Sequence, residues 1–372
     1  MSDGGHEEKD VVLFVGNFDS ATGYAWKLIE SFWRAISEYD FLKKYNFELC
    51  YPTVSAVSNE IAESDIVVSE LDFNNHLFSA LALLIRKKVK VLYLTDQKTA
   101  SVKYVLYRLC GVKKIVVHDH TPGVRSSPGR WKKMIKRIGS SGSWVSCDAA
   151  FAVSPYVERR LYEVNGLPAN KIFSVTNGID IKNMRSKEGV SSPVRIVTVS
   201  RANYYKGIDF ALKVISRLVY VHAEKNFHYT HFGDGPDLDR FKKMSAELKI
   251  EEYVTFAGGG HNIESELNNA DIALHPSRGE AMSLAILEYM KAGLAIVVSD
   301  NESVSSALKQ DYDSVFYRSL DEASAADVVL SLINDNDKII LFGRRAQKSL
   351  KVKYSQEKMM LRLRECLSIV LD

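Results

Sequence analysis

The sequence predicts an α/β protein with two Rossmann-like domains in tandem, each built on a doubly wound parallel sheet. Runs rich in valine and isoleucine, without clean polar alternation, recur between helical patterns, which indicates strands buried on both faces of a sheet. This rhythm stops at the polar stretch Ser186–Pro193 and then begins again. A length of 372 residues also suits two hydrophobic cores. We therefore expect domains at 1–185 and 186–355, followed by a last helix within 356–372.

The first half opens with a strand at Val11–Gly16, a small polar loop and a helix at Tyr24–Ser37. Four further strands are predicted there, at Asp65–Val68, Val89–Tyr93, Lys114–Val117 and Ala149–Val153. The second half alternates strands with helices through strands at Val194–Ser200, Phe227–Gly233, Tyr253–Gly258, Asp271–Pro276 and Leu294–Asp300, and helices at Ile208–Val219, Leu238–Leu248, Ile263–Asn269 and Ala281–Gly293. Parallel sheets gather ligand-binding loops at the carboxyl ends of their strands, so we expect the chemistry there, in a cleft between the domains.

Composition excludes several classes of protein. The chain is 46% hydrophobic and 26% charged, which is ordinary for a soluble globular protein, and its net charge of +3 predicts no strong electrostatic steering of a ligand. The first ten residues are polar, and the longest apolar runs fall short of the roughly 20 residues of a membrane span. Four scattered cysteines without CxxC spacing (Cys50, Cys110, Cys147 and Cys366) suggest reduced thiols in a cytoplasmic protein, without a zinc site.

Two glutamates mark the segment that carries most of the chemistry. The predicted helix from Ala281 to Gly293 is apolar nearly all round, yet Glu288 lies in its middle and Glu280 stands just before it. A buried carboxylate is unfavourable without partners. From the residues alone, Glu288 has either a salt bridge to a lysine of its own domain or ligand hydroxyl groups as its partners.

The spacing of these glutamates resembles the E-x7-E motif of the retaining nucleotide-sugar glycosyltransferases of family 4 (glycosyl transferases group 1), which have the GT-B fold. Other segments match in order. "VSRANYYKG" resembles the diphosphate-binding loop of that family, "FGDGP" its glycine-rich turn, and "VTNGID" the segment that closes the first domain, preceded by the similar "CDAAFAVSPYVERRL". The resemblance runs from about residue 145 to 300, and it is the combination of motifs that is specific.

This resemblance implies how the donor is held. Arg201 and Lys206 would stabilise charge that develops on the leaving diphosphate, which is a role suited to fixed cations. Glu280 would contact the donor sugar, with backbone groups of Met282, Ser283 and Leu284 nearby at the helix N-terminus. Glu288 would accept hydrogen bonds from the ribose hydroxyls. The alternative for the two cations is an ordinary surface pair on a turn.

Gly233 and Gly235 would let the backbone approach the nucleotide, although a plain strand-to-helix turn explains them nearly as well. This sequence has Ala281, Ser283 and Tyr289 where many relatives have glycine, glycine or proline, and alanine. That difference leaves the sugar preference open.

Signals in the first half are weaker. Thr22 and Gly23 come closest to the glycine pair that approaches the donor phosphate in the family. A histidine at the end of a strand resembles one placed near the donor sugar; we choose His118, with His120 as the alternative and a packed histidine as the ordinary explanation. The resemblance implies catalysis without a metal or other cofactor. The DxD triplets (Asp237/Asp239, Asp311/Asp313 and Asp335/Asp337) are interpreted as turn and helix acids.

The segment Arg130–Ile138 has the pattern of a basic amphipathic helix. Trp131, Met134, Ile135 and Ile138 fall on one face, and the other carries only cations. This pattern is typical of a helix at the surface of an anionic membrane. A surface helix packed on the core is the ordinary alternative. A nucleic-acid groove is disfavoured by the low net charge and the lack of a nucleic-acid motif.

We therefore predict a retaining enzyme that moves a sugar from a nucleotide-sugar donor, expected to be a UDP-sugar, to a hydroxyl of a glycan or lipid-linked acceptor, with closure of the domains around Asn177–Asp180. Such reactions assemble cell-surface polysaccharide or lipopolysaccharide, and the location would be cytoplasmic or peripheral on the cytoplasmic membrane face. The last helix would cross back to the first domain, as in relatives.

Several alternatives stay open at this point. They are a nucleotide-sugar epimerase or a glycogen-synthase-like enzyme on the same fold, and a non-catalytic protein that binds nucleotide sugars. Because neither half opens with GxGxxG, a dinucleotide oxidoreductase is disfavoured.

Overall fold

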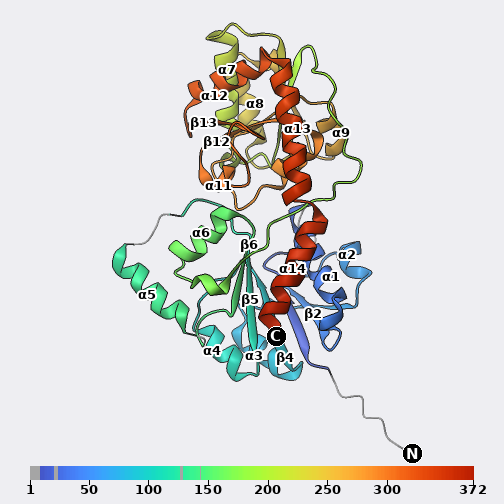
Figure 1. Ribbon diagram of the computed structural model, residues 1–372, viewed down its shortest axis with the longest axis vertical. Helices are drawn as coiled ribbons and strands as arrows, with labels where there is room; N and C mark the ends of the chain where they lie inside the picture. The colour runs from blue at the N-terminus through green and yellow to red at the C-terminus, as the bar shows by residue number, and fades with distance from the viewer. Residues whose placement is uncertain (1–8, 21–23, 126–128, 143) are drawn as a thin grey trace, which may run out of the picture. The chain divides into compact units, whose positions relative to one another are not determined.

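The computed structural model describes residues 9–20, 24–125, 129–142 and 144–372. The chain forms two compact units (Figure 1). Unit 1 takes the chain up to Thr176, apart from Pro122–Val124, together with Met359–Asp372. Unit 2 takes Asn177–Lys358 and Pro122–Val124. The boundaries between the units thus fall after residues 176 and 358. The sequence analysis predicted them after residues 185 and 355.

Unit 1 is built on a seven-stranded sheet in the order β3-β2-β1-β4-β5-β6-β7. Every neighbouring pair is parallel, and β1 lies between β2 and β4. The strands are β1 (Val11–Val15), β2 (Asn46–Tyr51), β3 (Ile66–Glu70), β4 (Val89–Thr95), β5 (Lys114–Asp119), β6 (Ala149–Ala152) and β7 (Ile172–Ser174). The change of direction at β1 makes this a doubly wound sheet.

Unit 2 has a six-stranded sheet in the order β10-β9-β8-β11-β12-β13, again parallel throughout. Its strands are β8 (Val194–Val199), β9 (Phe227–Phe232), β10 (Val254–Gly258), β11 (Ile272–His275), β12 (Ala295–Ser299) and β13 (Val315–Tyr317). The winding reverses between β8 and β11, so the loops that follow these two strands meet at the carboxyl edge of the sheet.

Helices connect the strands in both units. Unit 1 contains α1 (Tyr24–Glu38), α2 (Asn59–Ala62), α3 (Leu77–Arg86), α4 (Lys103–Leu109), α5 (Arg130–Ser141) and α6 (Pro155–Glu163). Unit 2 contains α7 (Ile208–Tyr220), α8 (Leu238–Glu247), α9 (Ile263–Asn268), α10 (Leu284–Ala292), α11 (Glu302–Ser305), α12 (Glu322–Ile333) and α13 (Asn336–Lys353). Short 3-10 turns lie at Asp40–Leu42, Ala169–Lys171, Tyr204–Lys206 and Glu251–Tyr253. None of the helices in the described ranges is both long and apolar enough to cross a bilayer.

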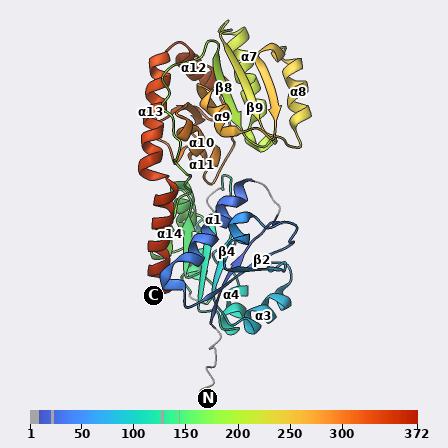
Figure 2. The same ribbon diagram turned by 90° about the vertical axis from the view of Figure 1, so that its right-hand side faces the viewer.

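The C-terminal helix α14 (Gln356–Leu371) packs on the core of unit 1, although its sequence follows unit 2. Met359, Leu363 and Leu367 are buried in the same apolar cluster as Phe14 and Trp33. In both views the helix lies beside α1 (Figure 2). Tyr39 Oη donates to the carbonyl of Met360 at 2.8 Å, which fixes the helix against the end of α1.

The strand pattern fails to predict three strands. β2 alternates polar and apolar residues, a pattern typical of a strand, but it was not among the predicted strands. β7 and β13 are only three residues long. The helix predicted from Ala281 begins instead at Leu284, because Ser283 has extended backbone (φ −74°, ψ 121°). Ala281 and Met282 therefore belong to the loop after β11.

Candidate functional site

Lys206 lies in the loop that leaves the carboxyl end of β8. The loop closes with a 3-10 turn at Tyr204–Lys206, capped by the Asn203 side chain, which accepts from Tyr205 N–H at 2.9 Å. Gly207 follows with φ +75°, and a Cβ at this position would lie 2.0 Å from the Pro276 carbonyl oxygen. Only glycine fits such a contact. Gly207 therefore seats the loop after β8 directly against the loop after β11.

This contact brings together two of the predicted site residues. Lys206 Nζ lies 2.6 Å from Glu280 Oε1, in an ion pair between the loop after β8 and the loop after β11. Glu280 is 6% exposed, whereas the Lys206 side chain is more open. A third group, the buried His275 at the end of β11, places Nε2 3.6 Å from the same carboxylate oxygen.

The charge on Glu280 is strongly favoured. Burial by itself raises the pKa of the Glu280 carboxyl, but the Lys206 ammonium and then His275 outweigh it and lower this pKa to about 2. The carboxylate is therefore ionised at any physiological pH. It forms a fixed anion beside a partly open cation, which is a pairing suited to a ligand with both hydroxyl and phosphate groups.

Arg278 braces these two loops and is a residue that the sequence reasoning missed. Its guanidinium forms two bonds to the Asp209 carboxylate at 2.9 and 2.8 Å, at the start of α7. It also lies over the Tyr204 ring at 4.0 Å and donates to the Tyr204 carbonyl. Arg278 N–H donates to the Tyr205 carbonyl at 3.1 Å. One feature of the sequence could have indicated this contact. Arg278 lies two residues before Glu280, and its partner Asp209 lies three residues after Lys206.

Gly233 and Gly235 are required by the packing of loops. A Cβ on Gly233 would lie 2.2 Å from the Ser200 carbonyl oxygen, and one on Gly235 would lie 2.3 Å from that of Ala202. Gly233 also has φ +127°. Ala202 N–H donates to the Asp234 carbonyl at 2.9 Å, so the two loops form a single layer. This explains both glycines as structural supports of the loop that holds Arg201; backbone contact with a nucleotide stays a prediction.

Arg201 itself is exposed, and its guanidinium forms no ion pair or hydrogen bond with residues in the described ranges. It lies five residues before Lys206 in the same loop. The predicted cations therefore occupy one loop at the carboxyl edge of unit 2, with Lys206 paired and Arg201 open to solvent.

The start of α10 supplies the remaining donor-site residues that were predicted. Met282 is buried, and its carbonyl accepts from Asn177 Nδ2 at 3.3 Å. Ser283 occupies the N-cap position but makes no side-chain cap bond, and Leu284 opens the helix. Glu288 is half-buried in α10, so its environment is less apolar than the sequence pattern indicated. Burial raises the pKa of the neighbouring Tyr289 hydroxyl, and the Glu288 charge raises it further.

Tyr289, where many relatives have alanine, supplies a hydrogen bond at the end of β8, beyond the residues that pair with β11. Its hydroxyl accepts from Val199 N–H at 2.6 Å at the end of β8. The β8 and β11 ladder pairs only Ile196–Val197 with Ile272–Ala273, and beyond it the Thr198 hydroxyl donates to the Leu274 carbonyl. Tyr289 thus supports the floor below the Lys206 and Glu280 loops.

In unit 1, the two histidine candidates have different positions. His118, predicted to lie near the sugar, is 1% exposed within β5, with Nδ1 2.8 Å from the Tyr93 hydroxyl and its ring against Phe32. Burial lowers its pKa well below the ordinary value, and His120 lowers it further. His120, the alternative, follows the end of β5, is half-buried and has its ring 4.2 Å from that of His118. The histidine with the more open position is therefore His120.

Gly23 and Thr22 lie outside the described residues. Within the described ranges no three His, Cys, Asp or Glu side chains are grouped as metal ligands. One acid of each DxD triplet has a structural partner: Asp237 accepts from Tyr204 N–H, Asp313 accepts from the Ser349 hydroxyl, and Asp335 caps α13. Cys50, Cys110, Cys147 and Cys366 are all unpaired thiols.

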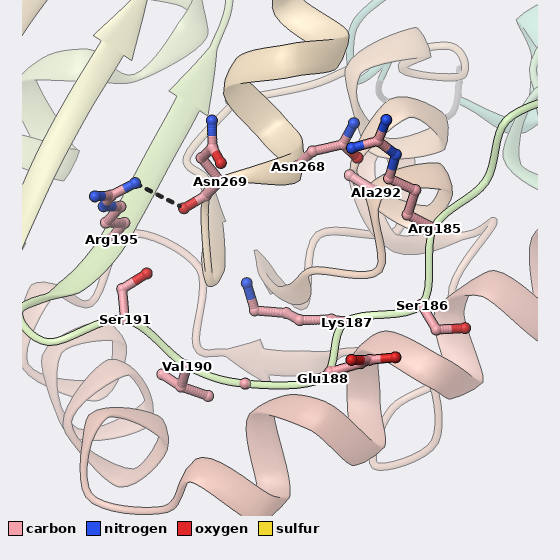
Figure 3. Close-up of a pocket in the computed structure, with 11 residues that line it drawn as sticks. Arg185, Ser186, Lys187, Glu188, Val190, Ser191, Arg195, Asn268, Asn269 and Ala292 are labelled. Atoms are coloured by element: carbon pink, nitrogen blue, oxygen red, sulfur yellow. Dashed lines mark hydrogen bonds between the residues drawn. The ribbon is translucent and has the colours of Figure 1, made fainter.

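The predicted linker lines a pocket of about 380 Å³ at the opposite, amino edge of the unit 2 sheet (Figure 3). Arg195 donates to the Asn269 carbonyl at 3.5 Å (Figure 3). Lys187 Nζ lies 2.8 Å from Asp271 Oδ1. Lys187 of the linker and Arg195 of β8 thus both contact the segment that leads into β11. This pocket contains none of the predicted site residues, so we do not assign the reaction to it.

Comparison with known proteins agrees with this arrangement. The chain matches the sequence family described as Glycosyl transferases group 1 over residues 180–349, and that described as Glycosyltransferase Family 4 over residues 67–183. An uncharacterized glycosyltransferase of Methanocaldococcus jannaschii is 24% identical over 293 residues, which is 74% of each chain. The amylovoran biosynthesis glycosyltransferase AmsK of Erwinia amylovora is 24% identical over 201 residues, 51% of this chain and 49% of that protein.

Solved structures show the same architecture. The structure of Anabaena HepE in complex with UDP superposes with a TM-score of 0.75 and 14% identity, over 96% of this chain and 99% of that one. Two parallel-sheet units of this kind constitute the GT-B fold. The family matches together extend from residue 67 to 349 and include the paired Lys206 and Glu280. The chain therefore belongs to the family 4 glycosyltransferases of the GT-B fold and is a sugar transferase.

Proposed function

We propose that this enzyme transfers a sugar from a nucleotide donor, a UDP-sugar, to a hydroxyl of a glycan or lipid-linked acceptor with retention at the anomeric carbon. The ion pair between Lys206 and Glu280 is the observation that carries the proposal. Lys206 is the cation that would bind the diphosphate, and Glu280 is the anion that would bind sugar hydroxyls. The two lie together where the strand order of the sheet reverses, which is where α/β proteins bind ligands. UDP and UDP-glucose occupy the Anabaena neighbour, which supports the choice of base.

The chemistry follows from the charges at this edge. As the bond between the anomeric carbon and the β-phosphate oxygen breaks, negative charge builds on the diphosphate, and Lys206 with the exposed Arg201 stabilises it. The acceptor oxygen forms its new bond to the same face of that carbon. Its proton passes to the departing phosphate oxygen, so the step needs neither a protein nucleophile nor a metal ion.

Glu280 is suited to hold the sugar. Because its pKa is lowered to about 2, it remains an anion and accepts hydrogen bonds from hydroxyl groups. Backbone groups at Met282, Ser283 and Leu284 would orient the same sugar. Glu288, half-buried further along α10, would accept from the ribose.

Unit 1 is proposed to bind the acceptor. His120, beyond the end of β5, would meet the reacting sugar, while His118 beneath it would fix the ring of His120. Burial lowers the pKa of His120 to about 4, so this histidine is neutral at physiological pH. It can therefore accept a hydrogen bond from a hydroxyl group or donate one to it.

We place the enzyme in the cytoplasm, in contact with an anionic membrane face through Arg130–Ile138. Lipid-linked acceptors of cell-surface polysaccharide or lipopolysaccharide are found at such a face.

A donor screen tests the reaction. Purified enzyme is incubated with UDP-, GDP-, ADP- and TDP-sugars in EDTA, and release of nucleoside diphosphate is followed with and without membrane extract. The proposal would be supported if UDP is released in EDTA and if NMR shows that the product has the same anomeric configuration as the donor sugar. Tight nucleotide binding with no release in any mixture would indicate a non-catalytic binding protein instead, and release that requires a metal would contradict the mechanism.

A further inference from the structure

Helix α5 is attached to unit 1 through its polar and basic side. Lys136 Nζ donates to the Val164 carbonyl at 2.9 Å, and Arg137 donates to the Tyr162 hydroxyl at 2.9 Å while its guanidinium lies over the same ring. Ser140 is buried against Asn165. A Cβ on Gly166 would lie 2.9 Å from the Arg137 backbone nitrogen, so the helix backbone itself approaches the chain after α6.

The apolar side of α5 consequently faces outward. Trp131, Met134, Ile135 and Ile138, here called the α5 stripe, are 77%, 46%, 66% and 66% exposed. A helix that packs its stripe on the core, the ordinary alternative from the sequence, would bury these residues. This orientation is the reverse of that of a normal surface helix, and the described residues of unit 1 do not cover the stripe.

The exposed apolar surface continues onto α4. Trp144, just beyond α5, is 56% exposed, and the chain after it pairs with the start of α4 through Ser101 N–H to the Val145 carbonyl at 2.7 Å. Val102, the N-cap residue of α4, and Leu109 at the end of α4 are 77% and 71% exposed, and Leu106 lies between them. In Figure 1, α5 and α4 follow one another along one side of unit 1. We call Val102, Leu106 and Leu109 the α4 side.

The charges around the stripe identify the partner. Helix α5 carries five Lys or Arg residues and no acid. Lys136 and Arg137 anchor the helix, while Arg130 and Lys132 are exposed beside Trp131. Large apolar side chains flanked by exposed cations match the interface of an anionic bilayer, in which the apolar groups enter the acyl boundary and the cations meet lipid phosphates.

We propose that the α5 stripe, Trp144 and the α4 side form one continuous surface that binds an anionic lipid bilayer. This deepens the proposed function, because it would keep unit 1 at the surface where a lipid-linked acceptor lies. Binding of lipid is a property of this surface alone and does not require the donor site.

Vesicle sedimentation tests the surface with the full-length protein. The probes are vesicles of phosphatidylcholine alone and of phosphatidylcholine with one quarter phosphatidylglycerol, at low and high salt. Three variants are compared: Ile135→Asn with Ile138→Asn in the α5 stripe, Val102→Ser with Leu109→Ser in the α4 side, and Ile369→Asn as a matched control. Ile369 is 63% exposed in α14, also in unit 1. Circular dichroism and thermal unfolding verify that each variant is folded.

We expect wild type and Ile369→Asn to bind anionic vesicles about 10-fold or more tightly than neutral ones, with the difference reduced by salt. The α5 variant should lose about 10-fold in affinity and the α4 variant about 3-fold or more, because each lacks two exposed apolar side chains that would enter the bilayer. Equal binding by the α5 variant and wild type would overturn the proposal. An α4 variant that binds like wild type would overturn the continuous surface.

Other partners give different outcomes. A concentration-dependent dimer that the α5 variant breaks, without vesicle binding, would assign the stripe to a second copy and contradict the proposal. Release of diphosphate from a soluble donor is measured on the same samples without vesicles. If the wild type does not bind anionic vesicles but still releases diphosphate, the surface alone is refuted. If the wild type binds vesicles normally but releases no diphosphate, the proposed reaction alone is refuted.

Discussion

The carboxyl edges of the two sheets have opposite electrostatic designs. At the edge of unit 2, Lys206 and Glu280 form a close ion pair, and the pKa of the carboxyl is lowered to about 2. At the edge of unit 1, Asp96 lies near Asp119; burial first and then the charge of Asp119 raise its pKa to about 7. Arg160 pairs with Asp119 at 2.9 Å and does not fully offset this repulsion.

The difference separates the roles of the two edges. Unit 2 presents cations where a diphosphate can be held, with Arg201 exposed and Lys206 partly open. Unit 1 presents acids and neutral histidines, an environment that disfavours an anion and suits the hydroxyl group of an acceptor. Under the proposed function, the same doubly wound architecture would serve the donor in unit 2 and the acceptor in unit 1 through different loop residues.

The largest expected effect comes from removing the cation at the unit 2 edge. In Lys206→Met we expect turnover to fall by about 100- to 1,000-fold, because charge on the leaving diphosphate loses a fixed partner. The matched control is Lys213→Met in α7, a lysine 3.1 Å from Glu322 with a half-exposed side chain. Steady-state release of nucleoside diphosphate measures both variants. Similar turnover in Lys206→Met and Lys213→Met would remove the electrostatic basis of the comparison.

The next effect concerns the loops that carry this edge. Gly233→Ala places a Cβ against the Ser200 carbonyl oxygen, in addition to a positive φ, and should destabilise unit 2 by about 3 kcal/mol. Gly260→Ala is the control, since Gly260 also has a positive φ but no atom within 4 Å of the added Cβ. It should lose only about 1 kcal/mol. Urea unfolding distinguishes the two; equal losses would mean that loop contact contributes nothing.

The Arg278 brace should have a smaller, more specific effect. Arg278→Lys keeps the charge but loses the two-bond contact to Asp209 and the flat contact with Tyr204. We expect about a 10-fold loss in kcat/KM for the donor, because the loops of Lys206 and Glu280 become less fixed. Arg362→Lys, an exposed arginine of α14, serves as control. A fall in thermal stability with unchanged kcat/KM would show a purely structural role.

The smallest effect lies at the unit 1 edge and depends on pH. The folded pKa of Asp96, about 7, lies above its ordinary value of 3.8, so its contribution to stability is full below pH 4 and is lost as pH rises through 7. Asp96→Asn removes this loss and keeps an oxygen to accept from His120 N–H. The difference in Tm between variant and wild type should therefore become more positive from pH 5 to pH 8. A difference in Tm that does not change with pH would contradict the raised pKa. Asp239→Asn, at an exposed aspartate of α8, serves as the control.

The sequence could predict most strands of the two sheets and the loops that carry the candidate site residues, but not the contacts between those residues. The buried strands β8 and β11 were evident as apolar runs, and the E-x7-E spacing selected Glu280. The pairing of Lys206 with Glu280 joins residues 74 positions apart and depends on how Gly207 and Pro276 pack, which no local pattern encodes. Arg278 was missed for the same reason, since its partners Asp209 and Tyr204 follow a different strand.

Helix α5 shows a second feature that the sequence could not predict, namely which side of the helix faces the protein. Its period predicted an apolar stripe correctly, but periodicity does not state which side faces the protein. The orientation is decided by Lys136, Arg137 and Ser140, whose partners lie after α6. His118 is a similar case, because the strand pattern placed it at the edge while its burial depends on Phe32 and Tyr93.

The most direct test of the contrast between the two edges is calorimetric binding of UDP to wild type, Lys206→Met and Asp96→Asn. The two variants change one charged group at each edge. We predict that Lys206→Met weakens the Kd by about 10-fold or more, since it removes a phosphate partner, while Asp96→Asn leaves it unchanged. Unchanged affinity in Lys206→Met, or an equal loss in Asp96→Asn, would contradict the assignment of the donor to the carboxyl edge of unit 2.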